Sequence, residues 1–285
     1  MVLVAKPPGP TSHDVVDVVR GALATTRVGH LGTLDPFAEG LLVLVVGRAT
    51  RLAGFAGGWS KSYEGVIRLG VTTTTDDATG ATLATSDAWR GLGPLRIRAA
   101  LERFRGAFEQ RPPAYSAVSV AGERAYARAR RGEGVTPAAR RVEVLELELV
   151  SLVLPDLRFR ATVSAGTYLR SLARDVGEVL GCGALLAALR RTRVGSFRLE
   201  EAVAPEAVTA AAIRDPQALV ADLPRRDLDA AEREAVVHGR PIAAGEGAAA
   251  ARVALFADGR LVAVAESARA EGGAVLQPRV VVAEV

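Results

Sequence analysis

Asp35 is the residue of this chain that is best placed to do chemistry, and it lies in the stretch GHLGTLDPFAEG. Pro36 fixes its own backbone and disfavours a helical conformation at Asp35, so we expect the carboxylate on a stiff, extended turn. The apolar run LLVLVV, Leu41 to Val46, follows and predicts a buried strand. A carboxylate held on such a loop can serve as a general base or as a nucleophile. The alternative is an ordinary surface turn, because Asp-Pro is a common turn pair.

Three further side chains could contribute to such a site. Tyr63 opens the alternating segment SYEGVIRLG, which predicts a half-buried strand with Tyr63 on its inner face, where it could equally be a core aromatic. Arg170 follows a predicted strand and precedes a helix predicted from about Ser171 to Leu180. Its guanidinium could pair with a carboxylate or simply face solvent. His30, close before Asp35, is either a second site group or a loop histidine.

The elements that must position these residues follow from the same kind of pattern. Thr11 and Asp14 have the spacing of a capping box, which predicts a helix starting near Ser12. The stretches VEVLELELVSLVL and LRFRATVSA alternate strongly and are predicted to form paired strands. The stretch GALLAALRRTRVGSF is predicted to form a short helix and then a strand, and spacing alone makes Leu189 a core leucine.

Length and composition bound the possible classes of protein. A chain of 285 residues with 49% hydrophobic and 24% charged residues predicts one large domain or two domains of a soluble globular protein. Its apolar runs are too short to span a bilayer, and we see no secretory signal near the start. Cys182 is the only cysteine, which excludes an intramolecular disulfide and favours a cytoplasmic location. The histidines lack metal-ligand spacing, so a reaction without metal or cofactor is the economical interpretation.

The distribution of charge favours a polyanionic partner. The formal net charge is +4, and the segment from Arg98 to Arg141 contains ten arginines against four glutamates. Such an excess is typical of RNA-contacting surfaces, although most charged segments are only solvated. The excess of positive charge in this segment therefore favours contact with RNA.

The composition changes near the C-terminus. Asp215-Pro216 and Leu223-Pro224 suggest a linker between two folded units. Beyond it, Asp258-Gly259 stands between two alternating runs, which is a strong hairpin signal. We predict domains at residues 1–222 and 223–285, the second being small and mostly β.

Four stretches in order resemble the TruB-type tRNA pseudouridine synthases, over most of residues 1 to about 215. They are KPPGPTSHDVV, GHLGTLDPFAEG, KSYEGVIRLG and GTYLRSLARDVGEVLGCGALLAALRRTRVGSF. The resemblance implies an α+β fold with a mixed, largely antiparallel sheet flanked by helices and loops, plus a PUA-like C-terminal RNA-binding domain. It implies an isomerase that converts the uridine at position 55 of the tRNA T-loop into pseudouridine without a cofactor. The partner would be the T-stem-loop of tRNA, contacted by an insertion at about residues 105–141, and we expect a monomer without membrane contact.

The resemblance also implies roles for individual residues. Asp35 would be the catalytic residue, and Arg170 would pair with it. Tyr63 would stack on the target base and remove a proton from it. Tyr168 and Leu189 would line the base pocket, which must be poor in water.

Three more residues complete the expected site. Lys6 and Pro7 resemble a motif that supports the catalytic loop, and a turn between strand and helix agrees with that. The target base must leave the RNA stack to reach the carboxylate. His30 is our candidate for the side chain that fills the vacated place.

The chain departs from the family pattern at Phe37 and Glu39, which bears on pocket shape rather than on the chemistry. Two other classes of protein stay open. One is a non-catalytic RNA-binding or RNA-folding protein that uses the same basic surface. The other is a hydrolase of a nucleoside or sugar bond, which would normally use a second carboxylate as its acid partner.

Overall fold

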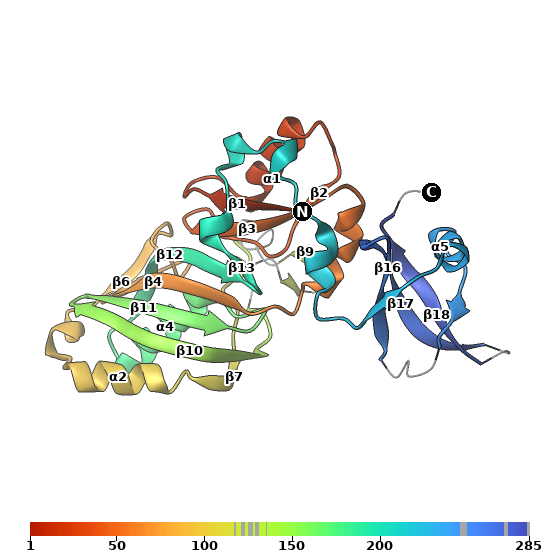
Figure 1. The fold of residues 1–285 in the computed structure, drawn as a ribbon. Coiled ribbons are helices and arrows are strands. Elements are labelled where there is room, and N and C mark those ends of the chain that lie inside the picture. The colour runs from red at the N-terminus through yellow and green to blue at the C-terminus, as the bar shows by residue number, and fades with distance from the viewer. Residues whose placement is uncertain are drawn as a thin grey trace.

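The computed structural model describes residues 1–116, 118–120, 123–124, 128, 131–134, 136–245, 250–270 and 273–283. A large sheet is built from the N-terminal three quarters of the chain, and a smaller sheet from the C-terminal part (Figure 1). The strands of the large sheet are β1 (Val2–Lys6), β2 (Val28–His30), β3 (Glu39–Val46), β4 (Lys61–Leu69), β7 (Gly106–Gln110), β10 (Arg140–Val153), β11 (Asp156–Val163), β12 (Ala184–Val194) and β13 (Phe197–Arg198).

The large sheet has the order β1-β3-β12-β4-β11-β10-β7, with β2 beside β3 and β13 beside β12. Its pairs are antiparallel except for a short parallel contact between β12 and β3. Two small hairpins accompany it, β5 (Val71–Thr73) with β6 (Thr82–Thr85) and β8 (Ser119–Val120) with β9 (Glu123–Arg124). The sheet is therefore mixed and largely antiparallel, as expected from the sequence.

The helices are α1 (Ser12–Ala22), α2 (Pro94–Glu102), α4 (Leu169–Leu180) and α5 (Ala230–Val237). Short 3₁₀ segments are η1 (Gly47–Phe55), η2 (Ala88–Gly91), η3 (Leu199–Glu201), η4 (Pro205–Ala207), η5 (Ala210–Ala212) and η6 (Pro216–Val220). Helix α1 begins after Thr11 with both hydrogen bonds of the predicted capping box. Helix α4 ends at Gly181, whose φ of 79° gives a left-handed glycine cap. No helix of the described ranges is long and apolar enough to cross a membrane.

Helix α4 packs against one face of the large sheet (Figure 1). Its apolar side is buried, including Leu172, Val176 and Leu180 at helical spacing. On the facing strand β4, Tyr63, Gly65 and the alternate residues after them are buried, as the alternation predicts. This shared core fixes the start of α4 against the middle of the sheet.

One expected element is wrong. The stretch after Gly183 forms no helix, because β12 runs without a break from Ala184 to Val194. Alanine and leucine favour helices locally, but here the segment pairs with β4 along its length and with β3 near Arg190. Pairing and burial in the middle of a sheet outweigh that local preference. Leu189 therefore lies on a strand.

The smaller sheet has the order β14 (Arg225–Asp227), β16 (Arg252–Ala257), β17 (Arg260–Ala270), β18 (Gly273–Val281) and β15 (Ile242–Ala243). Asp258 and Gly259 form the tight turn between β16 and β17, with φ angles of 50° and 74°, so the predicted hairpin is confirmed. Phe256 and Leu261 of this sheet share an apolar cluster with Leu3 of β1. The two sheets therefore bury apolar surface against each other.

Candidate active site

Asp35 lies on the loop between β2 and β3, in a turn closed by a hydrogen bond from the Ala38 amide to the Asp35 carbonyl at 3.1 Å. Arg170, in the first turn of α4, meets its carboxylate with two parallel hydrogen bonds. Nε donates to Oδ2 and Nη2 to Oδ1, both at 2.9 Å. The Arg170 side chain is 6% exposed and that of Asp35 is 31% exposed. The two side chains thus form a bidentate ion pair in which Arg170 is buried and Asp35 is partly buried.

A second carboxylate lies behind this pair. Asp77 is buried, and its Oδ2 is 3.6 Å from Nη1 of Arg170. Its Oδ1 accepts from the Thr75 hydroxyl at 2.8 Å and from the amide and hydroxyl of Thr79 at 2.9 and 2.6 Å. Sequence reasoning missed Asp77, because TTTTDDATG carries only the signal of a polar turn. Its threonines are the one local hint, since they can hold a buried carboxylate.

The remaining donors of Arg170 bind backbone carbonyls. Nη1 donates to the Thr75 carbonyl at 2.9 Å and Nη2 to the Tyr115 carbonyl at 2.8 Å. The neighbouring Ser171 hydroxyl binds the Arg111 carbonyl at 2.8 Å. The start of α4 therefore joins three separate chain segments around one guanidinium.

Burial and the neighbouring charges shift the pKa of Asp35 in opposite directions. Burial raises the pKa of Asp35 above its ordinary value of 3.8, and the charge and hydrogen bonds of Arg170 counteract that effect without cancelling it. The nearby Asp77 charge also raises the pKa, and Lys6 lowers it. Arg170 thus favours the ionised form of Asp35, but burial has the larger influence on its pKa. The result is a carboxylate that is more basic than an exposed aspartate.

The backbone of the loop is held by residues from the start of the chain. Lys6 is buried, and its Nζ donates to the carbonyls of Pro7, Pro10 and Pro36 at 2.8, 2.7 and 3.2 Å. Burial lowers the pKa of Lys6 to about 8, which the charge of Asp35 opposes. The hydroxyl of Ser12 bridges the amide and carbonyl of Leu34 at 2.8 and 3.0 Å. Lys6 thus contacts the residue after Asp35, and the supporting role of Lys6 and Pro7 stays a prediction.

The other expected residues surround this centre at different depths. Tyr63, on β4, and Leu189, on β12, are buried in the same apolar cluster as Leu34. Tyr168 is the N-cap residue of α4, and its backbone amide and carbonyl both bind the Gln110 side chain, at 2.8 and 3.1 Å. Burial raises the pKa of the Tyr168 phenol, and the charge of Arg140 opposes it.

His30 lies apart, on β2 opposite Leu44 of β3. Its Nδ1 is buried and has no hydrogen-bond partner among the described residues. Burial lowers the pKa of His30, and the positive charge of Arg191 adds to that. The ring is therefore held in its neutral form at pH 7.

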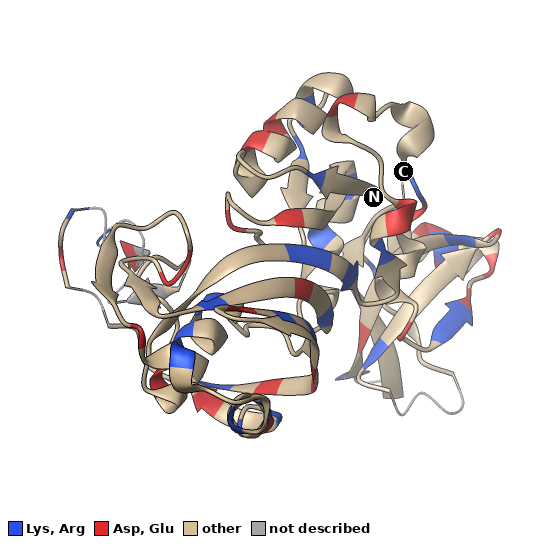
Figure 2. Ribbon diagram, turned by 90° about the vertical axis from the view of Figure 1, so that its left-hand side faces the viewer, with Lys and Arg blue, Asp and Glu red and all other residues tan. Residues whose placement is uncertain are grey.

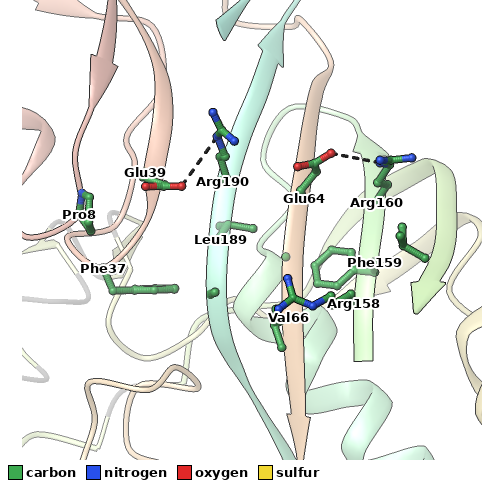
Figure 3. A pocket seen from close by; sticks show the side chains of 13 residues that line it. Pro8, Phe37, Glu39, Glu64, Val66, Arg158, Phe159, Arg160, Leu189 and Arg190 are labelled. Carbon is green, nitrogen blue, oxygen red and sulfur yellow. Dashed lines mark hydrogen bonds and ion pairs between the residues drawn. The ribbon is translucent and has the colours of Figure 1, made fainter. Parts of the chain in front are cut away.

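A cavity of about 490 Å³ adjoins the site (Figure 3). Figure 3 shows Glu39 directed at Arg190, 3.8 Å away, and Glu64 directed at Arg160, 3.1 Å away. The cavity includes one predicted pocket residue, Leu189, and its lining is Pro8, Phe37, Glu39, Glu64, Gly65, Val66, Val150, Arg158, Phe159, Arg160, Ala188, Leu189 and Arg190. Both departures from the family pattern therefore line a cavity, whereas the Asp35 carboxylate does not.

The basic segment is only partly described. Arg131 pairs with Glu123 and Glu133, and Arg128 also pairs with Glu133. Lys and Arg are interleaved with Asp and Glu over both sheets (Figure 2). Part of the predicted RNA-contacting insertion, residues 117, 121–122, 125–127, 129–130 and 135, lies outside the described residues. Within the ranges that are described, no group of His, Cys, Asp and Glu is arranged to hold a metal ion.

Comparison with solved structures defines the class of fold. A chain of a Cbf5–Nop10–Gar1 complex gives a TM-score of 0.73 at 26% identity, covering 98% of this chain and 84% of that chain. A chain of an H/ACA ribonucleoprotein bound to a substrate RNA containing 2′-deoxyuridine gives the same TM-score at 24% identity, over 99% of this chain and 84% of that one. The fold is the pseudouridine synthase fold with an added β-rich C-terminal part, as the sequence predicts.

The family follows from sequence comparison. Residues 20–169 match the model of the TruB family pseudouridylate synthase N-terminal domain, and residues 170–230 that of the tRNA pseudouridylate synthase B C-terminal domain. The tRNA pseudouridine synthase B of Thermobifida fusca (strain YX) is 45% identical over 94% of each chain. That of Mycobacterium tuberculosis (strain ATCC 25618 / H37Rv) is 42% identical over 98% of this chain and 96% of its own. This chain belongs to the TruB family.

Proposed function

We propose that this chain is an isomerase that converts the uridine at position 55 of the tRNA T-loop into pseudouridine, with Asp35 as its catalytic carboxylate. Membership of the TruB family supports tRNA pseudouridine synthesis. The observation that carries the role of Asp35 is its bidentate pair with the buried Arg170. A partly exposed carboxylate that Arg170 holds with two hydrogen bonds is oriented for attack on a bound nucleotide.

The reaction is an internal rearrangement, so its atoms balance without a co-reactant. The N1–C1′ bond of the nucleotide breaks, the uracil turns, C5 joins C1′, and the C5 proton leaves while N1 gains one. Asp35 supplies the group that acts on the nucleotide, as a nucleophile or as a base. The raised pKa of Asp35 makes the ionised carboxylate a stronger base than an exposed one. Arg170 keeps that carboxylate oriented in either case.

The walls of the site would hold the detached uracil. Tyr63 and Leu189 are buried in one cluster, which supports a stacking role for the ring and a closing role for the leucine. Tyr63 would also take the C5 proton, and Tyr168 would close the pocket at the start of α4. A water-poor pocket prevents the free base from escaping during its turn.

The target base must first leave the RNA stack, and unstacking it costs roughly a few kcal/mol, as in other base-flipping enzymes. A side chain that stacks in the vacated place returns about 1–3 kcal/mol. His30 is the proposed side chain, because its neutral ring stacks without carrying a charge into the helix.

We infer that two parts of the chain have different roles in the reaction. Residues 1–222 would form the catalytic unit, with an RNA-contacting insertion of about residues 105–141, and residues 223–285 a PUA-like RNA-binding unit. The protein would act as a monomer in the cytoplasm. The apolar contact between the two sheets supports their acting together on one RNA.

Two rival functions fit the site less well. RNA binding alone does not need a carboxylate pair assembled around a buried guanidinium. A hydrolase would need a second carboxylate free to act as an acid. Asp77 is a second carboxylate, but it is buried and its oxygens face Arg170, Thr75 and Thr79. It is therefore occupied in holding the arginine.

The test is to incubate the protein with a T-stem-loop RNA, without added metal or cofactor, and to measure pseudouridine by mass spectrometry after chemical derivatisation. We expect product with the wild-type chain. The Asp35→Asn variant should fold, bind the RNA and yield no detectable product, because an amide is neither a nucleophile nor a base at neutral pH. Asp17→Asn, an exposed acid on α1, is the matched control and should retain activity. Substantial product from a folded Asp35→Asn protein would refute the assigned role.

A further inference from the structure

Arg191, on β12, is a fully buried arginine that the proposed chemistry does not use. It is 0% exposed. Its Nε donates to the Leu41 carbonyl at 2.7 Å, Nη1 to the Thr33 carbonyl at 3.3 Å and Nη2 to the Gly32 carbonyl at 3.0 Å. Among the described residues no carboxylate forms an ion pair with it. All three nitrogens of its guanidinium donate to main-chain oxygens.

Those three oxygens lie on either side of Asp35 in the sequence. Gly32 and Thr33 come just before it, and Leu41 comes after it at the start of the β3 core. The planar guanidinium of Arg191 therefore connects the two ends of the loop that carries Asp35. Joining both ends of a loop to a third element reduces the conformations open to the residues between them.

The backbone of the same residue reinforces this closure. Arg191 pairs in parallel with Gly40 of β3. Gly40 has a φ of 108°, and a Cβ there would lie 2.3 Å from the Arg191 carbonyl oxygen. A glycine is thus required for β12 to approach the end of the loop this closely. Side chain and main chain of one residue hold both ends of the loop.

The charge of Arg191 is unfavourable for its surroundings. Burial lowers the pKa of Lys61 to about 8, and the charge of Arg191 adds to that effect. Burying a guanidinium without a counter-ion is costly, and an apolar side chain would fill the same space at lower cost. The benefit that offsets this cost is the fixed set of carbonyl contacts, which only a planar fork of donors can make at once.

We propose that Arg191 is a positioning residue for the isomerisation, fixing the Asp35 loop against the strand that carries Leu189. This rests on the proposed function. Arg191 and Leu189 lie two residues apart on β12, both buried, so they share one face of the strand. Arg191 therefore sets the distance between Leu189, a wall of the proposed base pocket, and the Asp35 carboxylate. It does so through its hydrogen bonds to the carbonyls of Gly32, Thr33 and Leu41.

The test is Arg191→Lys, which keeps the charge and most of the stem but cannot reach all three carbonyls. We expect single-turnover rates to fall by about 10- to 100-fold, since small misplacements of a catalytic group have effects of that order. The Kd for a T-stem-loop RNA should stay within about twofold, because the Arg191 side chain is fully buried and cannot contact the RNA directly. Arg193→Lys, on the same strand but exposed, is the matched control and should match the wild type in both quantities.

Arg191→Gln is a second variant that keeps donors but removes the charge, and its rate should fall at least as far with affinity again retained. An unchanged rate in Arg191→Lys, a parallel loss of rate and RNA affinity, or loss of folding in both variants would overturn the proposal and leave Arg191 a structural residue. The comparison is made against wild-type turnover. A wild-type chain without any product would refute the proposed function instead.

Discussion

Two buried arginines meet the Asp35 loop, and they hold different parts of it. Arg170, on α4, grips the carboxylate of Asp35 and has Asp77 behind it. Arg191, on β12, donates to the main-chain carbonyls of Gly32 and Thr33 in the loop and of Leu41 just after it, and to no carboxylate among the described residues. We call the first set of contacts the carboxylate clamp and the second the carbonyl clamp. The contrast shows that the charge environment of Asp35 and the position of its backbone are set from two separate elements.

The two clamps also differ in electrostatics. In the carboxylate clamp, Arg170 lowers the pKa of Asp35 while burial and Asp77 raise it, so charges directly tune the acid. In the carbonyl clamp the Arg191 guanidinium binds uncharged carbonyl groups. Burial lowers the pKa of His30 and of Lys61, and the charge of Arg191 lowers both further. A change in the first clamp should therefore move the pH dependence of the reaction. A change in the second should move the rate without moving the pH dependence.

The largest effect is expected from Arg170→Met. Removing the guanidinium leaves Asp77 buried without its counter-charge, which costs roughly 3–5 kcal/mol by analogy with other broken buried pairs. Asp35 also loses its orientation and its principal opposing charge, so product formation should fall by more than about 100-fold. Denaturant unfolding and single-turnover assays measure the two quantities.

Arg174→Met is the matched control for that change. Arg174 lies one turn along α4 and pairs with Asp76 and Asp175, but it does not touch Asp35. It should lose some stability and keep most of its rate. Equal losses of rate in both variants would mean that the carboxylate clamp acts only through the stability of α4.

Gly40→Ala tests the carbonyl clamp sterically. The new methyl group would collide with the Arg191 main chain at a φ that favours glycine, so we expect a loss of about 2–4 kcal/mol in the free energy of unfolding. Gly47→Ala, with a φ of 62° and no atom near the added Cβ, should lose only about 1 kcal/mol from backbone strain. Similar losses in the two variants would show that β12 and the loop can move apart freely.

Asp77→Asn should shift the acid side of the pH–rate profile. In the proposed mechanism the reaction needs ionised Asp35, so its rate should fall as pH drops through a pKa that burial has raised above 3.8. Removing the Asp77 charge removes one influence that raises this pKa, so the acid limb should move to lower pH. Arg170→Met should move it to higher pH, and Arg191→Lys should leave it in place. A shift in the same direction for the two carboxylate-clamp variants would contradict the electrostatic account.

The smallest effect is expected far from both clamps. Arg128 and Arg131 are already paired with Glu123 and Glu133, so Arg128→Gln with Arg131→Gln should change the salt dependence of RNA affinity only slightly. Arg103→Gln with Arg141→Gln removes two exposed charges of the same segment and should flatten the slope by up to about 0.7–0.9 for each RNA phosphate that is no longer neutralised. Filter binding at several salt concentrations measures both. A larger change in salt dependence for Arg128→Gln with Arg131→Gln would mean that the glutamate-paired arginines contact the RNA.

Much of this arrangement is local and could be predicted from the sequence. The capping box at Thr11, the alternation around Tyr63 and the glycine cap at Gly181 each depend on neighbouring residues only. The placement of Arg170 at a strand-to-helix junction follows from the same local patterns. The exception is β12, where alanine and leucine suggest a helix and pairing with β3 and β4 imposes a strand.

The sequence by itself determined that Asp35 stands on a constrained turn before a buried strand, because proline and apolar runs act over a few residues. Only the tertiary structure decided what surrounds that carboxylate. Asp77 and Arg191 are 42 and 156 residues away from it by their numbers, and no local pattern joins such distant positions. Burial likewise exists only in the folded chain, and it is burial that raises the pKa of Asp35 above the value its arginine alone would give.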